Sequence, residues 1–415
     1  MFRSLHNVNY RLFFAGSMVS NVGTWMQRIA QDWLVLQLTS SGTALGITTA
    51  LQFLPVMLLG LYGGVFADRF PKRNILFVTQ SVMGLSALLL GLLTVTGEVR
   101  VWHVYLLAAL LGLGTAFDNP ARQAFVVEMV GPADLSNAIG LNATSFNLGR
   151  VVGPATAGLL ISAAHNQTGP VFLINAASFV AILGALVAMH TDQLRPAPVR
   201  RRGPGALKEG LRYVRSREDL RTILLVTSCF GTFGMNFQVT TALMAKSVFG
   251  KDAGGYGLLG TVMAVGSLAG ALLAARREKP RIPVFLAAVT AFGVLETLAG
   301  LMPTYALFAL MLIPLGFTSL TALNGANALL QLRSDDSMRG RVLSLHVFVV
   351  FGTAPLISPV IGWVGEHVGA RWSVSGGGVL SLLGAVGGAW YLYRRPEIIR
   401  EEELPPALTT AGSGG

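Results

Sequence analysis

Long apolar segments, separated by shorter polar ones, recur along the whole chain. A helix needs roughly 20 mainly apolar residues to cross a bilayer, and twelve segments approach or exceed that length. They cover about residues 10–38, 44–66, 74–96, 101–119, 138–163, 170–190, 220–247, 255–275, 282–301, 305–329, 342–365 and 373–393. The first carries Arg28 and Asp32, and the fourth is the shortest. The pattern predicts an all-α membrane protein with twelve transmembrane helices.

The longest polar segment covers about 191–219 and divides these helices six and six. Pro196, Pro198 and Pro204 surround its basic run at 200–202. The piece that follows places apolar side chains on one helical face and basic ones on the other: Leu207, Leu211 and Val214 against Lys208, Arg212 and Arg215. This pattern indicates a linker and an amphipathic helix on an anionic membrane surface.

Four parts follow along the chain. We expect an N-terminal six-helix half at 1–190, a cytoplasmic linker at 191–219, a C-terminal six-helix half at 220–395 and a tail at 396–415. The tail is acidic and then rich in Pro, Gly and Ser, a composition typical of disorder.

Composition and charge support a membrane protein. Charged residues make up 12% of the chain, against about 25% in soluble domains. If the N-terminus is inside, 25 of the 31 Lys and Arg residues fall in inner segments and four in outer ones, while Arg28 and Arg150 lie within spans. Basic loops face the cytoplasm, so we predict a protein of the cell membrane with both termini cytoplasmic. The net charge of +11 then reflects topology, and no nucleic-acid partner is expected.

The inner loop between the second and third spans carries the most specific motif. It contains Gly64, Asp68, Arg69, Lys72 and Arg73. The glycine allows helices to approach closely, Asp68 can meet the positive N-terminus of another helix, and the basic residues can pair with acids. We interpret the motif as a conformational latch. The alternative is an ordinary basic inner loop with a turn at Asp68.

Asp118, near the inner end of the fourth span, has two interpretations. Its carboxylate could pair with Arg69 or Arg73 and belong to the latch. Equally, Asp118, Asn119 and Pro120 could begin a short surface helix, because Asp and Asn cap helix N-termini and Pro favours the first helical position.

The fifth span carries small residues and a proline. They are Gly149, Gly153, Pro154 and Gly158. Small residues four apart make a face for close helix packing, and the proline removes a backbone hydrogen bond and permits a bend. General helix packing is the alternative to a role specific to transport.

Polar residues inside the first span follow helical spacing. Asn21, Thr24, Arg28 and then Gln31 or Asp32 share one face. A charge at the bilayer centre costs roughly 2.5–3.5 kcal/mol, so it normally faces a partner or water. This face, with Asn21 and Gln31, could form a wall of the substrate cavity, in which Asp32 exchanges a proton or binds a cationic substrate. Alternatively, Arg28 and Asp32 form a permanent structural ion pair, since they lie four residues apart.

Other polar residues within spans are weaker substrate-cavity candidates. Arg150, with Asn147 one turn earlier, could face Asp32 or an anionic substrate. Glu296 is a second candidate for proton coupling. The remaining candidates are Asn236, Gln238, Asn324 and His346. Each can equally be satisfied by a hydrogen bond between helices.

The twelve spans, their six-and-six division and the loop motif together resemble the major facilitator superfamily. Its loop signature is G-x-L-A-D-R-x-G-R-K, from which this chain departs at Phe66 and Pro71. The corresponding motif of the second half is degraded, with Ala274 where the acid would be. The Gly149 to Gly158 stretch is similar to the family's antiporter motif, G-x-x-x-G-P-x-x-G-G, with Ala157 in place of one glycine. The resemblance implies a major facilitator fold, two six-helix halves around a cavity.

Four stretches resemble the branch that contains siderophore exporters and macrolide-efflux proteins. They are residues 9–13, 23–27, 33–35 and 116–121. This resemblance implies a secondary active transporter that exports drug-like compounds or secondary metabolites such as siderophores, by proton antiport with alternating access. Its partners would be a small-molecule substrate, protons and the lipid bilayer, and it would act as a monomer.

Other classes lack their sequence signatures. The chain has no G-x-x-x-x-G-K-[ST] nucleotide loop, no H-E-x-x-H motif, scattered histidines and a single cysteine, Cys229. We therefore expect no enzyme, no metal site and no cofactor. Two alternatives stay open: an importer of the same fold, and a polytopic membrane enzyme or receptor.

Overall fold

The computed structural model describes residues 2–194, 206–275 and 280–395. Within these ranges the chain is helical apart from short turns, and no strand occurs. Nine helical segments of the described part are long and apolar enough to cross a membrane. The helix at Val8–Thr39 falls outside this set, although it is 32 residues long, because Arg28 and Asp32 interrupt its apolar sequence. The described structure therefore has the all-α membrane architecture that the sequence predicts.

The first half contains five helical elements. They are α1 (Val8–Thr39), α2 (Gly42–Arg69), α3 (Lys72–Val95), α4 (Val101–Ala163) and α5 (Gly169–Ala188), preceded by η1 (Arg3–His6) and followed by η2 (Thr191–Gln193). Local capping fixes two of the starts. The Asn7 side chain accepts a hydrogen bond from the Tyr10 N–H, and the Ser41 side chain accepts one from the Ala44 N–H, which satisfies backbone donors left free at a helix N-terminus.

The 63-residue α4 holds two membrane passes. It would be roughly 95 Å long if straight, but Gly131 has φ 70° and ψ 179°, which breaks the helical path there. The first pass continues well beyond residue 119, where the sequence predicts its end. Ala121, Phe125 and Met129 recur at helical spacing and are buried in the first half, so packing extends the helix. Asp118 and Pro120 lie inside α4, and the predicted helix start at this point is wrong.

The second half contains more elements because two of its passes are interrupted. Its elements are α7 (Glu218–Cys229), η3 (Phe230–Gly234), α8 (Phe237–Leu243), η4 (Met244–Val248), α9 (Ala253–Ala275), α10 (Ile282–Gly300), α11 (Tyr305–Arg333), α12 (Arg339–Phe351), α13 (Ala354–Val364), η5 (Gly365–Gly369) and α14 (Ala370–Tyr393). The segment from α7 to η4 is one pass with a non-helical step at residues 235–236. A similar step at 352–353 separates α12 from α13.

Between the halves lies the short helix α6 (Ala206–Ser216). Its Glu209 pairs with Arg341 at 3.0 Å, its Tyr213 hydroxyl accepts a hydrogen bond from the Asp335 N–H, and its Val214 is 5% exposed. One face of α6 therefore rests on the second half. The basic run at 200–202, the side chains of Leu207 and Lys208, and the tail at 396–415 lie outside the described residues.

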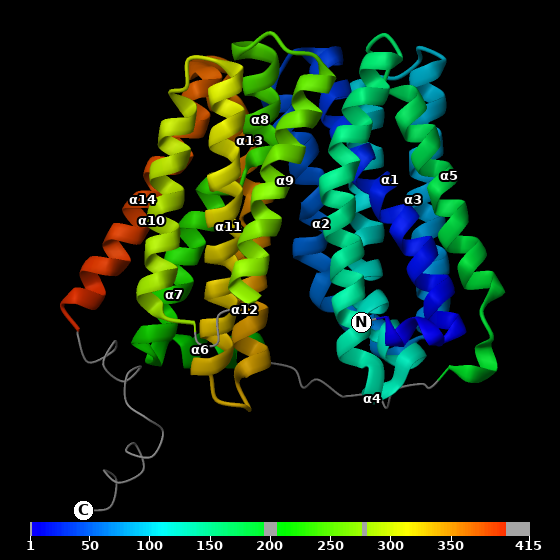
Figure 1. Cartoon of the computed structure of the whole chain (residues 1–415), viewed down its shortest axis with the longest axis horizontal. Helices are drawn as coiled ribbons and strands as arrows, with labels where there is room; N and C mark the ends of the chain where they lie inside the picture. Colours follow the sequence, from blue (N-terminus) through cyan, green and yellow to red (C-terminus); the bar gives the residue numbers. More distant parts are fainter. Residues whose placement is uncertain (1, 195–205, 276–279, 396–415) are drawn as a thin grey trace, which may run out of the picture.

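The helices gather in two bundles that meet along two seams (Figure 1). α1 and α3 each pack on α4 and α5, while α11 packs on α9 and α10, and α10 packs on α14. Across the bundles, α2 packs on α13 and the second pass of α4 packs on α9. Glycine allows both seams: a Cβ atom on Gly158 would lie 2.9 Å from the Ala253 carbonyl oxygen, and one on Gly46 would overlap the Ser358 carbonyl.

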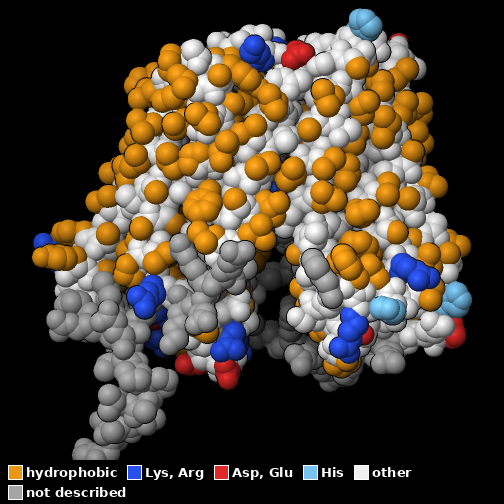
Figure 2. All heavy atoms as spheres, in the orientation of Figure 1, with side chains coloured by type: hydrophobic (Ala, Val, Ile, Leu, Met, Phe, Trp, Pro, Cys, Tyr) orange, Lys and Arg blue, Asp and Glu red, His pale blue; other side chains and the backbone are white. Residues whose placement is uncertain are grey.

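The surface has the polarity of a membrane protein. In Figure 2, apolar side chains cover most of the visible face, and charged side chains gather toward its two ends. α1 begins and α14 ends at the lower end of Figure 1, which we name the terminal end. The surface in Figure 2 is hollowed between the two bundles at this end and continuous at the opposite one, which we name the closed end.

Candidate functional site

The buried carboxylate of Asp32 in α1 accepts hydrogen bonds across the contact between the two halves. Its side chain is fully buried. Oδ1 accepts a hydrogen bond from Nε2 of Gln238 at 3.1 Å, and Oδ2 accepts one from the Tyr256 hydroxyl at 2.8 Å. Gln238 lies in α8 and Tyr256 in α9, so both donors belong to the second half.

Three glutamines extend this contact into a polar network. Nε2 of Gln238 also donates to Oε1 of Gln52 at 3.2 Å, and Nε2 of Gln52 donates to Oε1 of Gln31 at 3.1 Å. Gln31 in turn donates to the Val104 carbonyl at 3.3 Å. Gln31 and Gln52 are almost fully buried. The network therefore joins α1, α2 and α4 to α8 away from water.

Arg28 does not form an ion pair with Asp32 in this arrangement. Its guanidinium lies 5.1 Å from the ring centroid of Trp25 and 5.0 Å from that of Phe53. No ion pair within 4.0 Å joins Arg28 to an acid among the described residues. The carboxylate of Asp32 faces the second half instead, so the structure separates two charges that helical spacing allows to pair.

The second pass of α4 approaches α1 beside Trp25. A Cβ atom on Gly153 would lie 2.5 Å from the Trp25 Cβ, and one on Gly149 would lie 3.1 Å from the Asn21 carbonyl. Gly158, further along, faces α9 instead. The glycine motif thus contacts α1 at one end and the opposite half at the other. Asn21 also donates to the Ser145 hydroxyl at 3.0 Å.

Around the loop motif, two basic residues hold the first half together. Lys72 pairs with Glu128 at 3.0 Å, both largely buried, and Nε of Arg73 donates to the Leu186 carbonyl at 2.7 Å. Asp68 is half-buried and Arg69 exposed, and neither makes a side-chain hydrogen bond or ion pair with another residue of the described part.

Asp118 belongs to a separate cluster within the first half. It pairs with Arg122 at 3.0 Å, and its Oδ1 accepts hydrogen bonds from the Thr79 hydroxyl and the Gln80 amide at 2.9 and 2.6 Å. Arg122 also donates to the Ser17 hydroxyl at 2.8 Å. Asp118 therefore joins α4 to α3, and through Arg122 to α1, and it does not contact Arg69 or Arg73 here.

Polar contacts across the halves recur at the closed end. Oε2 of Glu366 in η5 accepts hydrogen bonds from the Ser41 hydroxyl at 2.7 Å and from the Thr43 N–H and hydroxyl at 3.0 and 2.8 Å. The Ser162 hydroxyl donates to Asp252 at 2.8 Å. The Gly255 N–H and this hydroxyl hold the pKa of the Asp252 carboxyl below its usual value, so it stays ionised at neutral pH.

The other predicted cavity residues lie apart from this network. Asn236 binds the Thr232 carbonyl and the Ser358 hydroxyl within the second half, and Asn147 donates to the Ala143 carbonyl of its own helix. Glu296 and His346 are buried, and Oε2 of Glu296 and Nδ1 of His346 have no hydrogen-bond partner in the structure as described. Asn324 is half-buried in α11.

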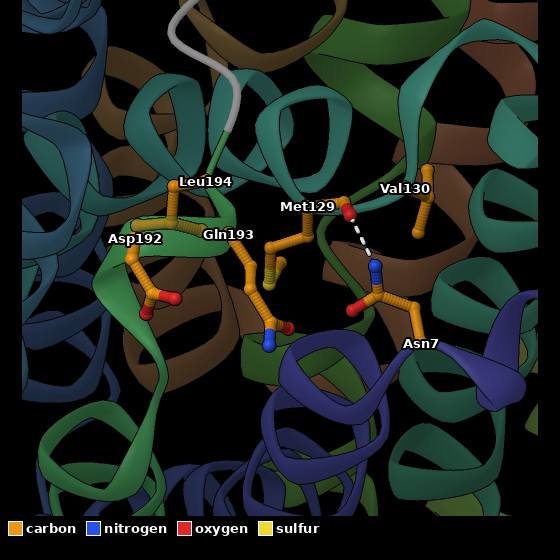
Figure 3. A pocket seen from close by; sticks show the side chains of 6 residues that line it. All are labelled: Asn7, Met129, Val130, Asp192, Gln193 and Leu194. Atoms are coloured by element: carbon orange, nitrogen blue, oxygen red, sulfur yellow. Dashed lines mark hydrogen bonds between the residues drawn. The ribbon is translucent and has the colours of Figure 1, made fainter.

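A small recess on the first half contains none of the predicted site residues. It is lined by Asn7, Met129, Val130, Asp192, Gln193 and Leu194 (Figure 3). Asn7 donates to the Met129 carbonyl across it at 2.6 Å. The lining residues come from the first half and from the start of the linker that follows it, so the recess lies outside the contact between the halves. No cluster of metal-ligating side chains occurs among the residues described.

Sequence reasoning missed three important partners. Gln52 is the only strongly polar residue in the apolar stretch of the second span from 44 to 66. An isolated amide in such a stretch indicates a polar partner, so the sequence could have identified it. Tyr256 and Glu128 gave no such signal, since each acts only through a partner distant in sequence.

Comparison with known proteins places these features in a family context. A family model described as "Transmembrane secretion effector" matches residues 1–406. The staphyloferrin A transporter of Staphylococcus aureus is 24% identical, over 83% of this chain and 87% of the relative. Macrolide efflux protein A of Streptococcus pyogenes is 26% identical (81% and 85%), and the enterobactin exporter of Escherichia coli is 25% identical (97% and 96%).

Solved structures share the fold. A bacterial homologue of the lysosomal transporter Spinster superposes with a TM-score of 0.72 at 13% identity, covering 96% of this chain and 98% of that one. The D-xylose–proton symporter superposes with a TM-score of 0.71 at 13% identity, covering 92% and 97%. At these identities the likeness establishes the helical architecture alone.

Proposed function

We propose, from the premise that this chain belongs to the transmembrane secretion effector family of major facilitator transporters, that it exports small molecules by proton antiport with alternating access. The chain is a multi-pass membrane transporter and not an enzyme. Relatives named for siderophore and macrolide export support drug-like compounds or secondary metabolites as its cargo. The observation that carries the proposal is the Asp32 carboxylate, which in the described part of the chain accepts side-chain hydrogen bonds from the opposite half alone.

Asp32 is suited to couple a proton to the movement of the halves. Hydrogen bonds to a charged group contribute about 1.5–3 kcal/mol each. A proton on the carboxylate would weaken both bonds, to Gln238 and Tyr256, and so weaken the contact between α1 and the second half. Two states with different contacts here would bind a proton with different affinity, which is the requirement for coupling. Glu296 is the second candidate for this role.

The two ends of the molecule suggest the direction of access. The terminal end is hollowed between the halves, and polar contacts join the halves at the closed end. We infer that the terminal end faces the cytoplasm, as the basic loops indicate, and that substrate enters there. The division at the 191–219 linker then separates the two halves that rock against each other, in a chain that acts as a monomer.

The loop motif would act when the terminal end closes. Asp68 and Arg69 have no side-chain partner among the described residues while this end is open. Closure would bring Asp68 to the positive start of a helix from the other half. Asp68→Asn should then slow transport while leaving ligand affinity within a few fold. A normal rate in this variant would contradict the latch.

Flux measurements in inverted membrane vesicles test the function. Uptake of a compound panel that includes a macrolide and a siderophore should depend on an imposed proton gradient and collapse with a protonophore. Vesicles carrying a chain with Gly153→Leu serve as the inactive control. Uptake into right-side-out vesicles alone would instead indicate an importer of the same fold.

A further inference from the structure

Two arginines inside membrane spans have no acidic partner. Arg28 in α1 and Arg150 in α4 take part in no ion pair or side-chain hydrogen bond with any described residue. The contrast with other basic groups of the first half is clear, because Lys72 pairs with Glu128 and Arg122 with Asp118. Arginine stays protonated under all ordinary conditions, so the pair adds two positive charges that no ion-paired acid of the described part balances.

Aromatic rings lie against Arg28 and connect it to the helix that carries Arg150. The Arg28 guanidinium lies over the rings of Trp25 and Phe53, and the Trp25 ring meets Phe146 edge-on at 5.6 Å. Phe146 precedes Arg150 by four residues, so both occupy one face of the same helix. Trp25, Arg28, Phe53, Phe146 and Arg150 therefore form one arginine–aromatic cluster where α1, α2 and α4 meet.

Asp32 forms no ion pair with this cluster among the described residues, although its charge still attracts that of Arg28. Its two carboxylate oxygens accept hydrogen bonds from Gln238 and Tyr256 of the second half. Planar guanidinium groups bind carboxylates in a two-pronged geometry, and aromatic rings pack on the flat body of an aromatic compound. The cluster offers both kinds of contact and lacks an internal anion.

We propose that the arginine–aromatic cluster selects organic anions with an aromatic body as the substrate class of this transporter. Arg28 and Arg150 bind the anionic group, and Trp25, Phe53 and Phe146 pack on the ring system. This inference rests on the proposed function, since it names the cargo of the same site.

Equilibrium binding to the purified full-length chain tests the proposal. The probes are 2-naphthoate, its uncharged analogue 2-naphthamide and the cation 2-naphthylmethylammonium. The wild-type chain should bind naphthoate at least about tenfold more tightly than naphthamide, as expected for charge-assisted hydrogen bonds. Arg28→Gln and Arg150→Gln should each remove about that factor and leave naphthamide binding unchanged. Arg11→Gln, an exposed change in the same helix as Arg28, is the matched control.

Conservative variants keep the test independent of folding. Arg28→Lys and Arg150→Lys retain the charge but lose the planar fork, so they should keep the preference for naphthoate with weaker binding. The proposal would be overturned if the wild-type chain showed no preference for the anion. It would also be overturned if folded glutamine or lysine variants bound naphthoate with unchanged affinity. Neither result would contradict export. If the chain preferred the anion but showed no flux into inverted vesicles, the proposed export would be overturned and the anion-binding cluster would stand.

Discussion

At the residue scale, the carboxylate of Asp32 connects chemistry to movement. It is the only acid in α1, and its hydrogen-bond donors Gln238 and Tyr256 lie 206 and 224 residues away in sequence. A buried charge is often no more stabilising than a neutral replacement, so a carboxylate whose side-chain donors in the described part of the chain belong to the other half suits a contact that is made and broken during transport. The residue that could be a static partner, Arg28, lies against aromatic rings instead.

Asp32→Asn separates titration from shape. The amide cannot gain or lose a proton but keeps one oxygen to accept a hydrogen bond. We expect proton-driven accumulation in inverted vesicles to fall at least about tenfold, with substrate exchange at equal concentrations largely kept. Tyr256→Phe is the matched control, since it removes a donor and leaves the carboxyl group, so accumulation should still follow the gradient. Full accumulation by Asp32→Asn would pass the coupling role to Glu296.

At the element scale, the second pass of α4 acts as a packed connection between α1 and α9. Its glycines lie within contact distance of backbone on both sides. In lipid, helices associate through close packing of such small residues, because the bilayer provides no hydrophobic drive between helices. The same surface must also slide or tilt as the halves move, so a bulky side chain interferes with the packing of the helices and with their movement.

Gly153→Leu tests that packing. A side chain at this position would overlap the Trp25 Cβ, and overpacking typically costs about 1–3 kcal/mol. We expect the variant to insert into the membrane at a normal level but to lose transport in inverted vesicles. Gly184→Leu on α5, where an added Cβ meets no atom within 4 Å, should transport normally. Equal activity in the two variants would contradict the packing role.

At the scale of the whole molecule, the structure holds the halves together at one end. Glu366 contacts Ser41 and Thr43 there, and Asp252 contacts Ser162. Alternating access requires these contacts to separate once in each cycle. The closed end is therefore a place where a covalent link would stop transport without touching the substrate.

A reversible cross-link checks this requirement. Ser41→Cys and Glu366→Cys, with the single native cysteine removed by Cys229→Ala, place two thiols where a hydroxyl and a carboxylate now meet at 2.7 Å. A short thiol-cleavable cross-linker should abolish transport in vesicles, and reduction should restore it. Each single-cysteine chain should be insensitive to the reagent. Transport that survives complete cross-linking would exclude opening at this end.

Local composition is enough to predict the class of the protein and the position of most helices. Apolar runs long enough to cross a bilayer and the basic bias of one set of loops depend on local composition, so they need no knowledge of packing. Local reasoning failed at residue 119, because the helix beyond it is held by buried contacts of Ala121 and Phe125 with other helices.

Which polar residues act together depends on how the helices pack. Helical spacing allowed Arg28 to pair with Asp32, yet packing against Phe53 and the donors of the second half separates them. Lys72 pairs with Glu128, and Asp118 pairs with Arg122 and accepts a hydrogen bond from Thr79. The loop motif specifies none of these partners. A buried charge takes the partner that the folded helices bring near, and spacing along one helix does not determine which helices pack together.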